Sequence, residues 1–101
     1  MVGRNSNFDL GLLHMSKFYT YLVRCNDGSL YAGYTVDLNE REVKHNEGKG
    51  SRYTCVRLPV KIVYSEEFQT KSEAMKREYE IKCLSKKEKE GLVRGITSST
   101  F

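Results

Sequence analysis

The sequence contains no tryptophan, one proline and three cysteines among its 101 residues. Cys25, Cys55 and Cys83 are odd in number and far apart, which argues against a disulfide framework, and no pair of them has the spacing of zinc ligands. We expect reduced thiols that pack as small apolar side chains. No apolar run reaches the roughly 20 residues of a membrane-spanning helix, and residues 10–13 are too short a stretch for a secretory signal. These absences favour a cytoplasmic protein.

The charge of the chain is moderately basic. Seventeen Lys and Arg residues against thirteen Asp and Glu give a net charge of +4 and a pI of about 9.0. Such an excess suits a polyanionic partner such as nucleic acid, although many proteins carry it without one. With 39% hydrophobic and 30% charged residues, the chain is predicted to form one domain with one modest core.

Residues 18–35 are predicted to form a β-hairpin. Side chains alternate along residues 19–25 as in a strand, although both faces of that strand are partly apolar. Residues 26–28, with the sequence NDG, tolerate the positive φ angles that a tight hairpin turn demands. Residues 30–35 form the second strand, and Gly33 inside it indicates a bulge or the close approach of a backbone or ligand.

A helix is predicted to follow the hairpin. Asp37 and Glu40, three residues apart, form a capping box that begins it, and the glycines of residues 48–50 mark its end. Arg41 and His45 lie four residues apart and therefore share one face of this helix. The side chains that the hairpin and the helix are predicted to bring together are Tyr21, Tyr31, Arg41 and His45.

Residues 49–65 carry four basic side chains and no acidic one, with a tyrosine among them. Such a segment can contact phosphates through its charges and a base or sugar through its ring. It can equally be a solvated loop whose charges keep the protein in solution. The candidate nucleic-acid-binding residues are Lys49, Arg52, Tyr53, Arg57 and Lys61.

The second half of the chain is predicted to hold one strand and two helices. Pro59 cannot donate to a sheet, so the third strand begins at or just after it. A second capping box, Thr70 with Glu73, begins a long helix. A third box, at residues 85 and 88, begins a short last helix that Gly91 and Gly95 weaken.

Glu78 on the long helix is predicted to lie among apolar side chains. With an advance of about 100° per residue and Ala74 set at zero, Ile81 falls near −20° and Glu78 near 40°, whereas Glu73 and Glu80 fall on the outer face. A carboxylate beside core residues costs several kcal/mol unless a cation or hydrogen-bond donors compensate. Glu78 therefore needs a partner, either a metal ion or a nearby Lys or Arg.

Several blocks of the sequence together resemble the signature of the GIY-YIG endonucleases. Residues 19–21 (YTY) and 31–33 (YAG) are separated by a short hairpin, and residues 37–41 and His45 follow them. Residues 74–82 are similar to the helix that carries the family's metal-binding glutamate. The first block lacks the glycine of the family name and the second has alanine for isoleucine, but both keep their tyrosines. The resemblance is strongest to the small single-domain bacterial members.

The resemblance implies a role for each candidate catalytic residue. Tyr31 would accept the proton of the attacking water, which requires a nearby cation because a phenol ordinarily ionises near pH 10. Tyr21 would orient that water, Arg41 would grip a phosphate oxygen, and Glu78 would hold Mg²⁺ or Mn²⁺. His45 would assist the base or bind phosphate. Structural alternatives are half-buried sheet tyrosines, an ion pair of Arg41 along its helix, and a neutral surface position for His45.

We therefore expect an α/β domain in which a small, mainly antiparallel three-stranded sheet is flanked by three or more helices. The expected divisions are a flexible arm (residues 1–17), a nuclease domain (18–94) and a frayed tail (95–101). The resemblance implies a metal-dependent endonuclease, either structure-selective or weakly specific, that acts on DNA rather than RNA and serves DNA repair, with a partner protein for targeting. The alternatives are a non-catalytic nucleic-acid-binding domain of the same fold and an interaction protein.

Overall fold

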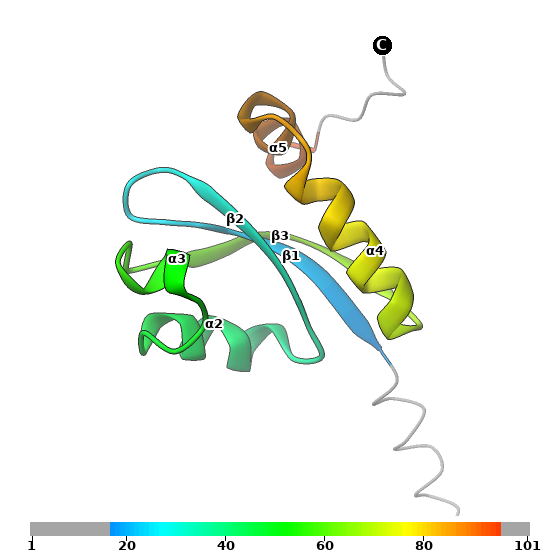
Figure 1. Cartoon of the computed structure of the whole chain (residues 1–101), viewed down its shortest axis with the longest axis horizontal. Coiled ribbons are helices and arrows are strands. Elements are labelled where there is room, and N and C mark those ends of the chain that lie inside the picture. The colour runs from blue at the N-terminus through cyan, green and yellow to red at the C-terminus, as the bar shows by residue number, and fades with distance from the viewer. Residues whose placement is uncertain (1–16, 96–101) are drawn as a thin grey trace, which may run out of the picture.

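A three-stranded antiparallel sheet forms the middle of this protein (Figure 1), whose computed structural model describes residues 17–95. The strands are β1 (Phe18–Arg24), β2 (Leu30–Thr35) and β3 (Lys61–Phe68), in the order β2-β1-β3. The helices are α2 (Leu38–Asn46), α3 (Arg52–Cys55), α4 (Lys71–Lys82) and α5 (Lys86–Val93). These elements confirm the predicted α/β domain with one small antiparallel sheet.

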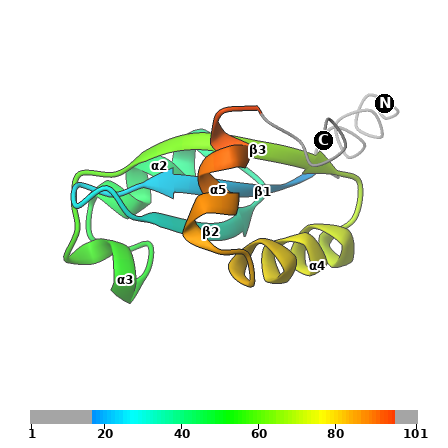
Figure 2. The ribbon, with the colours of Figure 1, turned by 90° about the horizontal axis from the view of Figure 1, so that it is seen from above.

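Helices cover both faces of the sheet. Figure 1 shows α2 on one side and α4 and α5 on the other, and Figure 2, seen from above, shows the three strands lying between these helices. The side with α4 and α5 is packed around Leu22, Ala32 and Ile81. The opposite side is packed around Tyr21 and Val23. The sheet is therefore a middle layer with a core on each face.

The central strand explains why the alternation in the first predicted strand was incomplete. Thr20, Tyr21, Leu22 and Val23 of β1 are all at most 1% exposed, although consecutive side chains point to opposite faces of a sheet. A strand that is buried on both faces needs few polar side chains on either. The partly apolar character of both faces was thus the mark of a central strand.

Local capping contacts begin each of the longer helices. The predicted boxes at Thr70 and Ser85 are both complete, with reciprocal contacts between side chain and backbone. The predicted box at Asp37 is only half formed. Its carboxylate accepts from the Glu40 amide at 3.0 Å, but its own amide donates to the Thr35 hydroxyl at 3.2 Å. The helix begins where predicted, with Thr35 in place of Glu40 as the returning partner.

The short helix α3, which lies within the basic segment, was not predicted. Ser51 caps α3 by accepting a hydrogen bond from the Thr54 amide at 3.1 Å. A helix of four residues is too short to show a periodic apolar pattern, so no signal in the sequence predicts it. Its position matters, because α3 lies next to α2 and beside the site described below.

The predicted arm lies almost entirely, and the predicted tail mostly, outside the described residues, so these two divisions remain predictions. Within residues 17–95 no helix is both long enough and apolar enough to cross a bilayer.

Candidate active site

A cleft of about 470 Å³ is lined by residues of β1, β2, α2 and α4. In Figure 1 these elements converge where α2 and α4 approach β2 from opposite sides of the sheet. Four of the five residues predicted for catalysis and metal binding line the cleft: Tyr21, Tyr31, Arg41 and Glu78. The fifth, His45, lies behind Tyr21. The fold thus gathers side chains that are as far as 57 residues apart in the chain (78 − 21 = 57).

Tyr21 is held in place by its neighbours on β2 and α2. Its hydroxyl oxygen lies 2.8 Å from Nε2 of His45, and the two rings meet edge to face with centroids 5.8 Å apart. Gly33 is the register partner of Tyr21 on β2, and a Cβ atom at residue 33 would lie 2.5 Å from the Tyr21 hydroxyl oxygen. The sequence predicted a bulge or the close approach of a backbone or ligand at Gly33, but the group that approaches is the Tyr21 side chain.

His45 is completely buried, with 0% of its surface exposed. The alternative of a neutral surface residue is therefore wrong, and direct contact with a phosphate is excluded in this arrangement. Burial, together with the positive charge of Arg41, lowers the pKa of His45 below its usual 6.5. Burial also raises the pKa of Tyr21 far above its usual 10.0, against the opposing charge of Arg41. The Tyr21–His45 pair is therefore uncharged at neutral pH.

Folding stability should fall as the pH drops below about 6.5, because the pKa of His45 is lowered from 6.5 in the folded protein. Below this pH the unfolded chain binds a proton that the folded protein does not, so the folded state is disfavoured. One proton gives a slope of at most about 1.4 kcal/mol per pH unit. Urea unfolding over roughly pH 5 to 8 measures it. The His14→Gln variant should keep the slope, and a flat profile in that variant would contradict the assignment to His45.

Tyr31 is more accessible than Tyr21, being only half-buried. Its ring packs edge to face against His45, with centroids 5.9 Å apart, and stacks on Tyr53 at 5.7 Å with an angle of 16° between the planes. The ammonium of Lys82 lies 5.7 Å from the centroid of the Tyr31 ring. A cation near the ring and a half-buried position distinguish this tyrosine from Tyr21.

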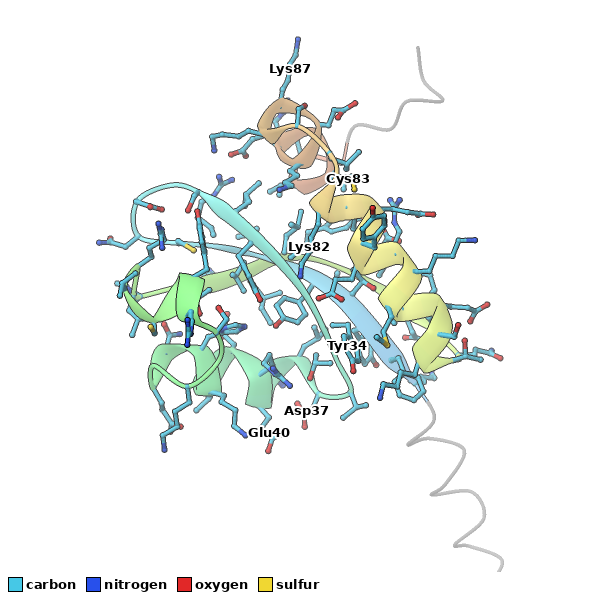
Figure 3. The ribbon with its side chains drawn as sticks, in the orientation of Figure 1. Tyr34, Asp37, Glu40, Lys82, Cys83 and Lys87 are labelled. Carbon is cyan, nitrogen blue, oxygen red and sulfur yellow. The ribbon has the colours of Figure 1, made fainter. Side chains whose placement is uncertain are left out.

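Glu78 lies where the helical periodicity of α4 predicted. Ala74 and Ile81 on the same side of α4 are fully buried, and only 19% of the Glu78 side chain is exposed. One of its oxygens lies 3.4 Å from Nζ of Lys82, one helical turn further on. Figure 3 shows Lys82 pointing from α4 toward β2. The Lys that Glu78 was predicted to need is therefore present, and its spacing of four residues is the signal by which it could have been found.

The residues at Glu78 fit a hard divalent cation. A carboxylate oxygen facing an open cleft is a ligand that Mg²⁺ accepts while keeping several of its waters. Among residues 17–95 no group of three His, Cys, Asp or Glu side chains could hold an ion, so a metal here would have at most two such side chains as ligands. The Lys82 side chain is 48% exposed and flexible, so it can leave the carboxylate when another cation takes its place.

Further positive charge lines the cleft. Arg41 on α2 and Lys71 at the start of α4 both face it, and the Lys71 ammonium lies 5.9 Å from the centroid of the Tyr34 ring. Sequence analysis missed Lys71 as well as Lys82, since neither stands in a basic run. The cleft thus combines three tyrosines, two glutamates (Glu40 and Glu78), an arginine and a lysine, which is a set suited to binding and attacking a phosphodiester.

The candidate nucleic-acid-binding residues differ in how they are related to the cleft. Tyr53 adjoins the cleft through its stack on Tyr31, and the Arg57 guanidinium lies 3.8 Å from the Tyr53 ring centroid. Arg57 also donates to an Asp27 carboxylate oxygen at 3.0 Å, so its charge is partly compensated. Lys61 begins β3, at the edge of the sheet away from β2. Lys49 and Arg52 are exposed near α3. Among these five, Tyr53 has the most direct link to the cleft.

Comparison with known proteins is consistent with this geometry. A family model described as "GIY-YIG catalytic domain" matches residues 17–91. The UPF0213 protein SERP0126 of Staphylococcus epidermidis is 57% identical over 75 residues, which cover 74% of this chain and 92% of that protein. The UPF0213 protein SSP2268 of Staphylococcus saprophyticus is 56% identical over 79 residues, which cover 78% of this chain and 96% of the relative.

Two solved structures are also similar. The solution NMR structure of the UPF0213 protein BH0048 from Bacillus halodurans shares 47% identity, with a TM-score of 0.50 over 77% of this chain and 83% of that chain. The solution NMR structure of the protein EF2693 from E. faecalis shares 40% identity, with a TM-score of 0.53 over 78% and 84%. These relatives share the fold and the length of the described domain.

Proposed function

This chain belongs to the GIY-YIG catalytic domain family, a family of nucleases, and from that premise we propose that it is a metal-dependent endonuclease that hydrolyses phosphodiester bonds in DNA. The observation that carries the proposal is the cleft. It brings together Tyr21 from β1, Tyr31 from β2, Arg41 from α2 and Glu78 from α4. No two of these residues come from the same element, so their meeting is a product of the whole fold.

Tyr31 is the better general base of the two tyrosines. Burial raises the pKa of Tyr21, and its hydroxyl is engaged with His45, so Tyr21 remains a neutral hydrogen-bonding group. Tyr31 is half-buried and lines the cleft, and the Lys82 ammonium lies near its ring. In this proposal Tyr31 takes the proton from the attacking water, and Tyr21 orients that water.

Arg41 and Glu78 act on the phosphate. The planar guanidinium of Arg41 can hold two non-bridging oxygens at once, a geometry that lysine cannot copy. Glu78 would hold Mg²⁺ or Mn²⁺, which when bound supplies Lewis-acid stabilisation for the charge on the phosphate and on the departing oxygen. The partial burial of Glu78 keeps its carboxylate turned toward the cleft. Hydrolysis then needs no covalent intermediate on the protein.

The nucleic acid is proposed to follow the cations around the cleft. Arg41 and Lys71 line the cleft, and Lys82 lies beside it at the Tyr31 ring. Lys49 and Arg52 extend the positive surface near α3. These side chains address phosphates, and phosphate contacts carry no sequence information. We therefore propose cleavage that is weakly specific or selective for the shape of the substrate, with a partner protein as the source of any further targeting.

The test is cleavage of labelled DNA by the purified full chain. Single-stranded, duplex, flapped and branched DNAs, with RNA counterparts, are incubated in Mg²⁺, in Mn²⁺ or in EDTA. We expect DNA cleavage that requires the metal and that the Arg41→Ala variant, purified identically, reduces by roughly 100-fold or more. Equal cleavage by wild type and variant would reveal a contaminating nuclease. Binding at low salt without cleavage of any substrate would contradict the proposed nuclease activity and favour a non-catalytic nucleic-acid-binding domain.

A further inference from the structure

A line of four hydrogen-bonding side chains runs from the cleft into the interior and ends at α3. The Tyr21 hydroxyl lies 2.8 Å from Nε2 of His45, and Nδ1 of His45 lies 2.9 Å from the Thr54 hydroxyl oxygen. The Thr54 oxygen in turn lies 2.9 Å from the Ser51 hydroxyl oxygen. Tyr21, His45 and Thr54 are at most 1% exposed. Both ring nitrogens of a buried imidazole thus have a partner inside the protein.

The chain around α3 is shaped to hold Thr54 against the imidazole. Ser51 caps α3 by accepting from the Thr54 amide at 3.1 Å, which fixes the position of Thr54 relative to Ser51. Gly50 brings the backbone directly against the ring, because a Cβ atom at residue 50 would lie only 2.0 Å from Nδ1 of His45. The short helix α3 therefore holds the Thr54 hydroxyl next to Nδ1 of His45.

The direction of these hydrogen bonds decides what Tyr21 presents to the cleft. A neutral imidazole has one N–H donor and one bare acceptor nitrogen. If Nδ1 carries the hydrogen, Nε2 accepts from the Tyr21 hydroxyl, and the lone pairs of the Tyr21 oxygen are left for a donor in the cleft. If Nε2 carries the hydrogen, it donates to the Tyr21 oxygen, and the hydroxyl hydrogen of Tyr21 points elsewhere. The two tautomers therefore differ in what Tyr21 offers the attacking water: a hydrogen-bond acceptor in the first case and a hydrogen-bond donor in the second.

The surroundings of Thr54 favour the first arrangement. Its hydroxyl donates to the Ser51 carbonyl oxygen at 3.4 Å, and the Ser51 hydroxyl oxygen at 2.9 Å can either accept from it or donate to it. A Thr54 hydroxyl that donates to Ser51 must accept from His45, and only an Nδ1–H can supply that hydrogen bond. We propose that Thr54 and Ser51 are positioning residues that hold His45 in the Nδ1–H tautomer, so that Nε2 accepts the Tyr21 hydroxyl and the Tyr21 oxygen faces the cleft as an acceptor.

The expected effect of the tautomer on catalysis rests on the proposed function, because it assumes that the protein hydrolyses DNA. The assignment of the tautomer itself does not rest on that function. The Tyr21 oxygen accepts a hydrogen bond from one O–H of the attacking water. The other O–H of that water then points at Tyr31, the proposed base. The tautomer exists whether or not the protein cleaves DNA. It is measured directly by two-bond proton–nitrogen correlation spectra of the ¹⁵N-labelled full chain. The chain contains only two histidines, so the His14→Gln variant assigns the signals of His45.

The variant that tests the proposal is Thr54→Val, which keeps the shape of the side chain and removes the hydroxyl. We expect wild type to show the Nδ1–H tautomer and Thr54→Val to shift His45 toward Nε2–H, because Nδ1 has lost its acceptor. The matched control is Thr20→Val. Thr20 is also fully buried, but its hydroxyl donates to the Ala74 carbonyl at 2.6 Å, on the face of the sheet that packs against α4. This control should leave the His45 tautomer unchanged.

Cleavage gives the second measurement. Loss of an orienting group should reduce kcat roughly 10- to 100-fold in Thr54→Val with little change in KM, and Thr54→Ser, which keeps the hydroxyl, should restore it. An Nε2–H tautomer in wild type, or an unchanged tautomer in Thr54→Val, overturns the proposal. If Thr54→Val does not fold, Ser51→Ala replaces it, with the same expected shift. A correct tautomer without cleavage of any DNA would leave this inference standing and overturn the proposed function.

Discussion

Replacing Glu78 with glutamine should reduce metal-dependent cleavage by at least about 100-fold in kcat/KM and leave the protein folded. Glutamine keeps the size and the hydrogen-bonding oxygen of the side chain but loses the charge that a divalent cation needs. Because the carboxylate lies beside the buried Ala74 and Ile81, removing its charge should not lower stability. Cleavage assays and thermal unfolding on the same preparations measure the two effects.

The matched control for this prediction is Glu80→Gln on the same helix. Glu80 is 48% exposed and pairs with Arg77 at 3.3 Å, away from the cleft. The change in charge and size is identical, so Glu80→Gln should cleave at the rate of wild type. Equal loss in the two variants would mean that the charge of α4, and not a ligand at Glu78, matters for activity.

Lys82→Met separates the metal ligand from the structural ion pair. This variant removes the partner that lies 3.4 Å from Glu78 and keeps the carboxylate. If Glu78 is a metal ligand, calorimetric titration with Mn²⁺ should show binding that is lost in Glu78→Gln and kept or strengthened in Lys82→Met, since a competing cation is gone. Undetectable Mn²⁺ binding in both wild type and Lys82→Met would leave Glu78 as a residue of a structural ion pair.

The Tyr31→Phe variant should lose cleavage by roughly 100- to 10,000-fold, the usual contribution of a general base. Phenylalanine keeps the stack on Tyr53 and the edge contact with His45, both of which involve the ring. The half-buried hydroxyl is the only group removed, so stability and DNA binding should change little. Rates and affinities measured over a range of pH, beside thermal unfolding, test this expectation.

Two other tyrosines serve as comparisons. Tyr21→Phe leaves Nε2 of the buried His45 without its partner at 2.8 Å, which should cost about 1–3 kcal/mol of folding stability. Tyr79 is 71% exposed on α4, and its replacement by phenylalanine should change neither the cleavage rate nor the folding stability. Cleavage by Tyr31→Phe at the wild-type rate would remove Tyr31 from the role of base.

The features predicted correctly from the sequence depend on residues that are close along the chain. The NDG turn, the complete capping boxes at Thr70 and Ser85, and the place of Glu78 on α4 each depend on neighbours within about one turn of helix or hairpin. Such relations hold in almost any fold that contains the element. They are visible in the sequence because backbone geometry alone sets their spacing.

The sequence could not reveal contacts between side chains that lie far apart in the chain. His45 shares a face with Arg41 on α2, and that face alone could not show that Tyr21, 24 residues away, covers it. The role of Tyr53 in nucleic-acid binding stays a prediction, and only the structure shows that its ring stacks on Tyr31 and lies beside the Arg57 guanidinium. The role of Lys61 also stays a prediction, and the strand order places this residue on the edge strand β3.

The sequence by itself determined the three strands and the three longer helices of this protein, the family to which its motifs point, and the need of Glu78 for a cation. Turn residues, caps and helical periodicity act over a few residues, so they can be inferred without knowing how the elements pack. Only the tertiary structure decided that His45 is buried between Tyr21 and Thr54, and that Lys82 stands between Glu78 and Tyr31. These contacts depend on strand register and on how the helices lie across the sheet, which no local pattern specifies.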